Sequence, residues 1–170
     1  MFIECSFGGI AAAKHRTTSK IMNTCETIES VEAVELESLT VQNENVVHLP
    51  LGLLGFEHIK SYTLLQNTSE SPFRWLQVID QPNLAFLVVP ALDIFPEYEP
   101  DVPAEDAKFL GLNSPDDALV FNIVTLLAKG AGTVNLKGPI VINRFTLKGK
   151  QVVLANASRY SIQHPLPLSR

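Results

Sequence analysis

The sequence contains few residues whose type and spacing could perform chemistry. Its four histidines are scattered along the 170 residues, at His15, His48, His58 and His164. No two of them have the close spacing of a zinc-binding motif. The two cysteines, Cys5 and Cys25, lack the spacing of a disulfide framework or a metal site. These residues therefore predict no metal centre.

Patterns for nucleophilic, acid–base or phosphate chemistry are equally sparse. Glu57 and Asp80 could form a pair of carboxylates, but Asp80 begins a turn in which its side chain can accept local backbone N–H groups. Gly130 and Gly132 begin a phosphate-loop pattern, yet Asn135 stands where the third glycine belongs. The sequence thus predicts a protein that is not an enzyme and needs no cofactor.

Candidate binding residues lie in a segment rich in proline and acid. Three prolines between residues 91 and 103 exclude an inner strand, because proline has no N–H to donate. Such a segment leaves apolar and acidic side chains together at the surface. The alternative is a solvated acidic loop with Phe95 and Tyr98 packed beneath it. The expected partner-binding residues are Glu57, Phe95, Glu97, Tyr98, Glu99 and Asp101.

Charge is divided unevenly along the chain, whose net charge is −5. Residues 1–117 contain all 18 acids, whereas residues 118–170 contain seven bases and no acid. Such asymmetry is typical of binding rather than of a particular fold. The basic end also contains aromatic residues, which leaves a nucleic-acid-binding surface as the alternative function, although the negative net charge opposes binding to phosphates.

The elements that must position these residues are organised around the apolar turn LPLGLLGFE, Leu49–Glu57. Gly52 and Gly55 are expected to adopt left-handed backbone conformations, so that the chain turns twice. The apolar side chains between them should then enter the core. These side chains are Leu51, Leu53, Leu54 and Phe56.

Strand patterns surround this turn. The expected strands cover residues 34–41, 46–49, 62–65, 73–79, 84–89, 119–127, 133–136, 140–142, 151–154 and 160–162. The strands at 73–79 and 84–89 should form a hairpin and, being apolar at nearly every position, should be covered on both faces. A short helix is expected to begin after Pro103 and to end near Gly111.

Regular short strands with turns between them predict an all-β, mainly antiparallel fold, a small barrel-like or sandwich-like single domain with one short helix. Residues 1–30 show no sustained period and are expected to form a disordered or atypical extension, leaving residues 31–170 as the domain. No apolar run is long enough to cross a bilayer, and Glu4 replaces the basic start of a secretory signal. A cytoplasmic protein without membrane contact is predicted.

Several motifs together resemble a known family. They are LPLGLLGFE (49–57), WLQVIDQPNLAFLVV (75–89), TVNLKGPIVIN (133–143), GKQVVL (149–154) and YSIQHPL (160–166). In sequence and in order they closely resemble the flagellar assembly factor FliW, over about residues 34–166.

The resemblance implies a non-enzymatic, cytoplasmic, β-barrel-like protein that binds flagellin and, alternatively, the translational regulator CsrA. In this family CsrA represses translation of flagellin by binding its messenger RNA. FliW that is freed by flagellin export captures CsrA and relieves the repression, without binding nucleic acid itself. The motifs consist mostly of core and turn residues, so the resemblance implies these partners without assigning a binding site.

Overall fold

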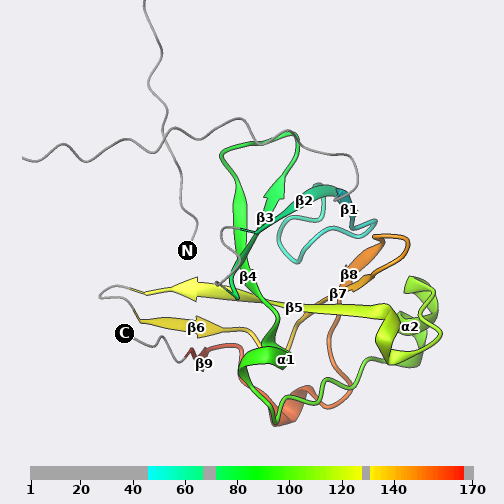
Figure 1. The fold of residues 1–170 in the computed structure, drawn as a ribbon, viewed down its shortest axis with the longest axis vertical. Helices are drawn as coiled ribbons and strands as arrows, with labels where there is room; N and C mark the ends of the chain where they lie inside the picture. Colours follow the sequence, from blue (N-terminus) through cyan, green and yellow to red (C-terminus); the bar gives the residue numbers. More distant parts are fainter. Residues whose placement is uncertain (1–45, 67–71, 128–130, 167–170) are drawn as a thin grey trace, which may run out of the picture.

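The structure is a computed structural model that describes residues 46–66, 72–127 and 131–166. Within these ranges, nine strands form one sheet accompanied by two short α-helices (Figure 1). The strands are β1 (Val46–His48), β2 (Ser61–Gln66), β3 (Arg74–Val78), β4 (Ala85–Val89), β5 (Ala118–Leu126), β6 (Gly132–Val134), β7 (Ile140–Asn143), β8 (Gly149–Gln151) and β9 (His164–Pro165). The helices are α1 (Ala91–Ile94) and α2 (Ala104–Leu110), with 3₁₀ turns at Pro115–Asp117 and Ala157–Arg159.

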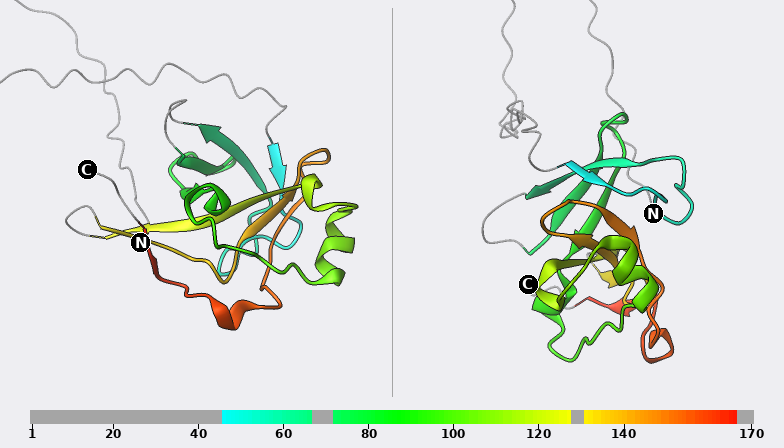
Figure 2. Two further views of the ribbon diagram at one scale, coloured as in Figure 1. Left: turned by 60° about the horizontal axis from the view of Figure 1, so that its bottom comes forward. Right: turned by 90° about the vertical axis from the view of Figure 1, so that its right-hand side faces the viewer.

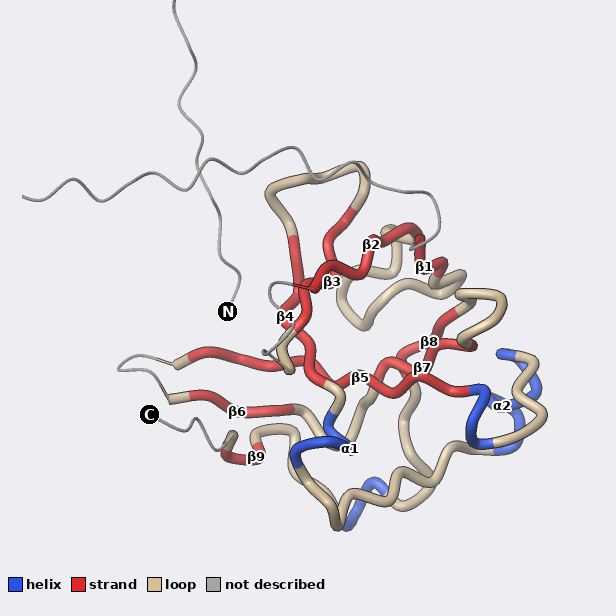
Figure 3. The backbone as a smooth tube through the Cα atoms, in the orientation of Figure 1, coloured by secondary structure: helices blue, strands red, loops and turns tan. Residues whose placement is uncertain are grey.

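The strand order is β1-β2-β3-β4-β5-β6-β9, with β7 on β5 and β8 on β7, and the pairs of named strands are antiparallel. Figures 2 and 3 show the sheet as two parts, a first wing of β1–β4 and a second wing of β6–β9. The two wings meet where β4 pairs with β5. The predicted antiparallel β class is therefore confirmed. The nine described strands do not form a closed sheet, so the description as a barrel holds only loosely. The prediction of a single helix is wrong, because α1 follows β4 directly.

Strand β5 joins the two wings. Its first four residues pair with β7 and its last three pair with β6. It pairs with β4 only through Val88 with Ile123 and Val89 with Asn122. These two residue pairs connect the wing β1–β4 to β5, and a separate bridge of His48 with Lys148, where the His48 N–H donates to the Leu147 carbonyl at 2.9 Å, connects β1 to the segment before β8.

Both faces of β5 are covered, which produces two hydrophobic cores. Phe121 of β5 and Ile140 of β7 pack with buried side chains of β1–β4 and the 49–59 turn in the first core. Val124 of β5 and Val141 of β7 pack with the α1, α2 and C-terminal segments in the second core. Successive strand residues point to opposite faces, so one apolar strand can serve both cores.

The turn at residues 49–57 has the predicted backbone but only part of the predicted burial. Gly52 and Gly55 have φ of 72° and 85°, which confirms the two left-handed positions. Leu53 is fully buried, whereas Leu51 and Leu54 are 50% and 67% exposed. The prediction that every apolar residue of this turn is buried is therefore wrong, because two chain reversals in so few residues point neighbouring leucines in opposite directions.

The predicted hairpin is present as β3 and β4, which pair in register from Arg74 with Val88 to Gln77 with Ala85. Its strands are less covered than expected. Leu76 is buried, but its neighbour Trp75 is only half-buried. Complete burial of both faces is thus wrong for this hairpin, whose outer face is open in part.

The strands predicted for the C-terminal part of the chain are only partly present. The strand expected at residues 160–162 is absent, and the last strand is β9, a little later. The chain instead forms a 3₁₀ turn at Ala157–Arg159, because Tyr160 is held in hydrogen bonds to another loop. The strands expected at 140–142 and 151–154 were predicted to pair with each other, but residues 140–142 pair with Gly149–Gln151, so only Gln151 of the expected partner strand lies in β8. The strand expected at 34–41 lies outside the described residues.

The predicted helix after Pro103 is confirmed as α2, which ends at Gly111 with φ of 69°. Helices of four and seven residues are too short to cross a membrane, and no helix within the described ranges is long and apolar enough to do so.

Alanine substitutions at the two turn glycines should differ in cost. Both need positive φ, which costs an alanine about 1–2 kcal/mol. A Cβ on Gly52 would also lie 2.6 Å from the Glu57 Cα and the Phe56 carbonyl oxygen, whereas a Cβ on Gly55 meets nothing within 4 Å. Gly52→Ala should therefore lower the free energy of unfolding by at least about 1 kcal/mol more than Gly55→Ala. Urea unfolding of both variants measures this, and equal losses would contradict it.

Candidate functional site

The acidic segment, residues 95–101, runs between α1 and α2 along the lower edge of the molecule in Figure 1. The side chains of Glu97, Glu99 and Asp101 are exposed, Phe95 is half-buried and Tyr98 is buried. The segment begins with two tight turns, in which the N–H of Phe95 donates to Ala91 and the N–H of Tyr98 donates to Phe95. The structure thus brings five of the six predicted site residues together in one loop.

Tyr98 anchors this loop to the sheet. It is only 3% exposed, and its hydroxyl donates to the Leu136 carbonyl oxygen at 2.9 Å and accepts from the Asn122 amide at 3.2 Å. The Asn122 amide also donates to the Asn135 carbonyl at 2.7 Å. Burial raises the pKa of Tyr98 to about 12. Tyr98 is therefore packed beneath the loop, as in the alternative interpretation, and is not available at the surface.

The C-terminal part of the chain fixes the backbone of the acidic segment. The Tyr160 hydroxyl donates to the Glu99 carbonyl at 2.9 Å and accepts from the Glu99 N–H at 3.0 Å. Asn156 donates to the same carbonyl at 2.9 Å and accepts from the Asp101 N–H at 3.2 Å. Because the backbone polar groups are used internally, the carboxylates are left to project into solvent from a fixed frame.

A hollow of about 500 Å³ lies beside this frame. Its walls include two edge-to-face aromatic contacts, Phe95 with His164 and Tyr98 with Tyr160, each with ring centroids 4.9 Å apart. Arg159 stands at the rim, 3.7 Å from the exposed carboxylate of Glu99. Such an exposed ion pair contributes at most about 1 kcal/mol and can exchange partners easily. The hollow could accept an apolar side chain of a partner protein, with charged residues of that partner next to it in sequence.

Glu57 lies apart from the other predicted site residues. Its carboxylate accepts the N–H of Gly55 at 2.8 Å, and this hydrogen bond lowers its pKa. Glu57 belongs to the 49–57 turn, on the wing of β1–β4. No hydrogen bond or ion pair among the described residues connects it with the acidic segment. Glu57 therefore supports its own turn.

The bases of the C-terminal half are largely bound to the protein itself. The Lys150 ammonium forms an ion pair with Asp106. The Lys148 ammonium donates to the Phe109 carbonyl at 2.6 Å and lies 3.8 Å from the centre of that ring. Arg144 likewise donates to a backbone carbonyl, that of residue 116, at 3.1 Å. These contacts reduce the donors available for a phosphate backbone.

Buried amides that position the loops are missing from the predicted site residues. Asn122 is fully buried and holds Tyr98, while Asn143 is 3% exposed and donates to the carbonyls of Leu110 and Gly111 at the end of α2. An asparagine inside an apolar strand is a usable signal, because a buried amide must find hydrogen-bond partners. Within the described ranges, no three side chains of His, Cys, Asp or Glu converge as metal ligands would.

Fold and site together define a class: a mainly antiparallel β protein with an open sheet, which presents a braced acidic loop beside an aromatic hollow. The family model described as FliW protein matches residues 30–166 of this chain. The chain therefore belongs to the FliW family, which confirms the predicted resemblance.

Individual relatives agree with this assignment. The flagellar assembly factor FliW of Treponema denticola is 39% identical over 127 residues, which are 74% of this chain and 85% of the relative. The FliW of Leptospira interrogans is 37% identical over 122 residues, or 71% and 81% of the two chains. A crystal structure of the flagellar assembly factor FliW matches with a TM-score of 0.69 at 32% identity, covering 76% of this chain and 91% of its own.

Removing the Tyr98 hydroxyl should destabilise the protein. Tyr98→Phe leaves the Leu136 carbonyl and part of the Asn122 amide without a partner in the core, which should cost about 1–3 kcal/mol at neutral pH. Tyr160→Phe is the matched control, since the Glu99 groups that it releases are near water and should cost less. Equal losses in urea unfolding would contradict the anchoring role.

The same variant should reveal the titration of Tyr98. The folded state holds the phenolic proton up to about pH 12, whereas the unfolded state releases it near about pH 10. The stability contributed by the protonated hydroxyl is therefore present below about pH 10 and is lost as the pH rises toward 12. The deficit of Tyr98→Phe relative to the natural protein should shrink between about pH 9 and about pH 11. A deficit that stays constant in urea unfolding over this range would contradict the shift.

Proposed function

We propose that this protein is a cytoplasmic flagellar assembly factor that binds flagellin and antagonises the translational regulator CsrA, so that repression of flagellin translation is relieved. The observation that carries the proposal is the FliW family match over residues 30–166. The named relatives, each called a flagellar assembly factor, support the biological process. Flagellin and CsrA as partners come from what the sequence resemblance implies.

The acidic segment supports an electrostatic contact with CsrA. A regulator that binds RNA must present positive potential, which the exposed carboxylates of Glu97, Glu99 and Asp101 would attract. Each exposed ion pair is worth about 0–1 kcal/mol, so the contribution must be collective. Because hydrogen bonds already fix the backbone of this segment, little ordering is needed on binding.

The aromatic hollow next to the carboxylates supplies the apolar part of a protein interface. Half-buried Phe95 and the neighbouring ring of His164 offer a concave surface for an anchoring side chain of a partner. An apolar anchor surrounded by charge is the usual anatomy of a specific interface. These features favour protein partners over the alternative, nucleic acid, because Lys148 and Lys150 already contact protein groups.

A pull-down with purified components tests the function. The protein should retain flagellin and CsrA of its own organism, and excess flagellin should displace CsrA. The protein alone should not shift a flagellin messenger RNA in a gel. Tight binding to RNA without binding to either protein would overturn the proposal in favour of the nucleic-acid alternative.

Reversing the acidic segment should slow association with CsrA. Replacing Glu97, Glu99 and Asp101 together by lysine should lower the association rate by about tenfold at low salt while dissociation changes little. The matched control reverses three other exposed acids, Asp80, Glu105 and Asp116, and gives the same change in net charge. Stopped-flow or surface-binding kinetics measure both. Equal slowing in the two variants would show that only net charge matters, and the acidic segment would lose its role.

Salt should reproduce this effect in the natural protein. Raising ionic strength from about 0.05 M to about 0.5 M shortens the Debye length to well below about 10 Å, which screens the attraction between separated charges. Association with CsrA should slow by about tenfold and dissociation should stay nearly constant. An association rate that is independent of salt would contradict electrostatic steering.

A further inference from the structure

The 3₁₀ turn Ala157–Arg159 and its flanking residues bring three side chains to the acidic segment. Asn156 and Tyr160 bind backbone groups of that segment through four hydrogen bonds of 2.9 to 3.2 Å. Arg159 instead approaches a side chain, and its guanidinium lies 3.7 Å from the Glu99 carboxylate. Because Asn156 and Tyr160 already fix the backbone, the contact of Arg159 is not needed to hold the segment in place.

The Arg159 guanidinium is placed against two groups, a carboxylate and an aromatic ring. Besides approaching Glu99, it lies over the Tyr160 ring, with its carbon 5.9 Å from the ring centre. A guanidinium is attracted to both kinds of group. The Tyr160 ring is fixed, because its hydroxyl binds the N–H and the carbonyl of Glu99 and the ring packs edge-to-face on the buried Tyr98. Tyr160 and Glu99 thus form a clamp for a guanidinium, and the fold sets up this clamp independently of Arg159.

Arg159 fills this clamp poorly. A charge-assisted hydrogen bond between a guanidinium and a carboxylate joins nitrogen and oxygen at about 2.7–2.9 Å. The distance between Arg159 and Glu99 is longer, 3.7 Å. Their side chains are also 58% and 77% exposed, so water screens the attraction between them. A guanidinium with better geometry could therefore replace that of Arg159.

The charges around the adjoining hollow favour a cation. Glu97 is part of its lining, and Glu99 lies next to Arg159 at its rim. Among the residues that line this hollow, Arg159 is the only lysine or arginine. Displacing the Arg159 side chain would thus leave two exposed carboxylates for a cation that comes from outside.

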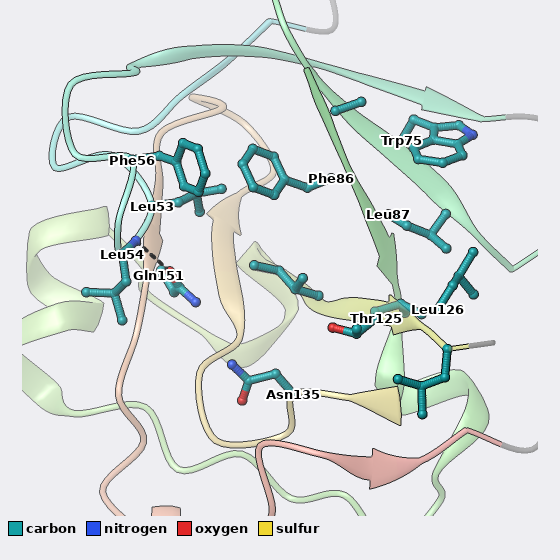
Figure 4. A pocket seen from close by; sticks show the side chains of 14 residues that line it. Leu53, Leu54, Phe56, Trp75, Phe86, Leu87, Thr125, Leu126, Asn135 and Gln151 are labelled. Carbon is teal, nitrogen blue, oxygen red and sulfur yellow. Dashed lines mark hydrogen bonds between the residues drawn. The ribbon is translucent and has the colours of Figure 1, made fainter. Parts of the chain in front are cut away.

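The hollow lined by β4 and β5 is different in this respect. It is of similar size, about 580 Å³, and its lining includes Leu53, Trp75 and Phe86 (Figure 4). None of the residues that line it has a charged side chain. Burying a cation there without a carboxylate would be costly. Of these two hollows, the one beside the acidic segment is suited to a cation.

We propose that the hollow beside the acidic segment binds an arginine side chain of a partner protein, and that Arg159 is an internal substitute which this arginine displaces. Arginine fits better than lysine, because a planar guanidinium can stack on Tyr160 and form two parallel hydrogen bonds with Glu99. Arg159 lowers the apparent affinity, since only molecules in which its side chain has left the clamp are ready to bind. Any protein that presents such an arginine beside an apolar residue could be the partner, so the site does not depend on flagellin or CsrA.

Three short peptides test the class of ligand, by NMR spectroscopy of the full-length protein labelled with ¹⁵N. The peptide acetyl-Leu-Arg-Leu-amide should move the backbone amide signals of Glu99 and Tyr160. It should also move the side-chain Nε signal of Arg159 toward the position of a free arginine. Replacing the arginine of the peptide by citrulline, which has the same shape without the charge, should remove these shifts. Replacing it by lysine should weaken binding at least about threefold.

Substitution of Arg159 tests its role as the internal substitute. Arg159→Gln should bind the arginine peptide about two- to fivefold more tightly, because an exposed ion pair no longer has to break first. Lys108→Gln, at an exposed position on α2, is the matched control with the same change in net charge, and it should bind as the natural protein does. Glu99→Gln keeps the backbone hydrogen bonds of residue 99 and should weaken binding at least about threefold. Unchanged amide signals in the rest of the spectrum show that each variant is folded.

Several outcomes would overturn the proposal. No shift of the Glu99 and Tyr160 signals at about 10 mM arginine peptide would exclude the site, since so weak an affinity has no use in recognition. Equally tight binding of the citrulline or the lysine peptide would exclude arginine as the ligand. An Arg159→Gln variant that gains no more affinity than Lys108→Gln would exclude the internal substitute. Because the peptides contain no part of flagellin or CsrA, this titration and the pull-down with those proteins can fail independently.

Discussion

The junction between β4 and β5 is the constraint on which the rest of the structure depends. Two residue pairs, Val88 with Ile123 and Val89 with Asn122, join β4 to β5, and the isolated bridge of His48 with Lys148 adds one further backbone contact between the wings. So short a hydrogen-bonded contact could not hold two wings by itself. Packing on both faces of β5 stabilises it, because the first core and the second core each contain side chains from β4, β5 and β7.

Buried polar side chains connect this sheet to the loops around it. Asn122 holds the hydroxyl of Tyr98, and Asn143 holds the carbonyls at the end of α2. A buried amide left without partners is costly, so each asparagine restricts its loop to a narrow set of positions. The loops thereby acquire the rigidity of the sheet. This arrangement suits a binding protein, in which exposed acids gain most when their backbone is already ordered.

Membership in the FliW family and the location of a binding surface rest on different residues. The motifs of the resemblance contain many core and turn residues, such as Leu53, Val134 and Ile140, which are all buried. Partners cannot contact such residues directly. The exposed carboxylates of the acidic segment lie outside these motifs, on a loop that the core positions. Comparison of sequences thus assigns the fold and the family. The binding site is instead proposed from the exposure and charge of the side chains in the acidic segment.

The sequence alone determined the features that depend on neighbours along the chain. Alternating apolar residues and turn chemistry predicted the β3–β4 hairpin, α2 and the left-handed glycines of the 49–57 turn, because each requires only local spacing. Only the tertiary structure decided which side chains are covered. Tyr98 is buried because it meets a carbonyl 38 residues away, and Leu54 is exposed although its neighbour is buried. Burial depends on segments that are distant in sequence, and local periodicity contains no information about where those segments lie.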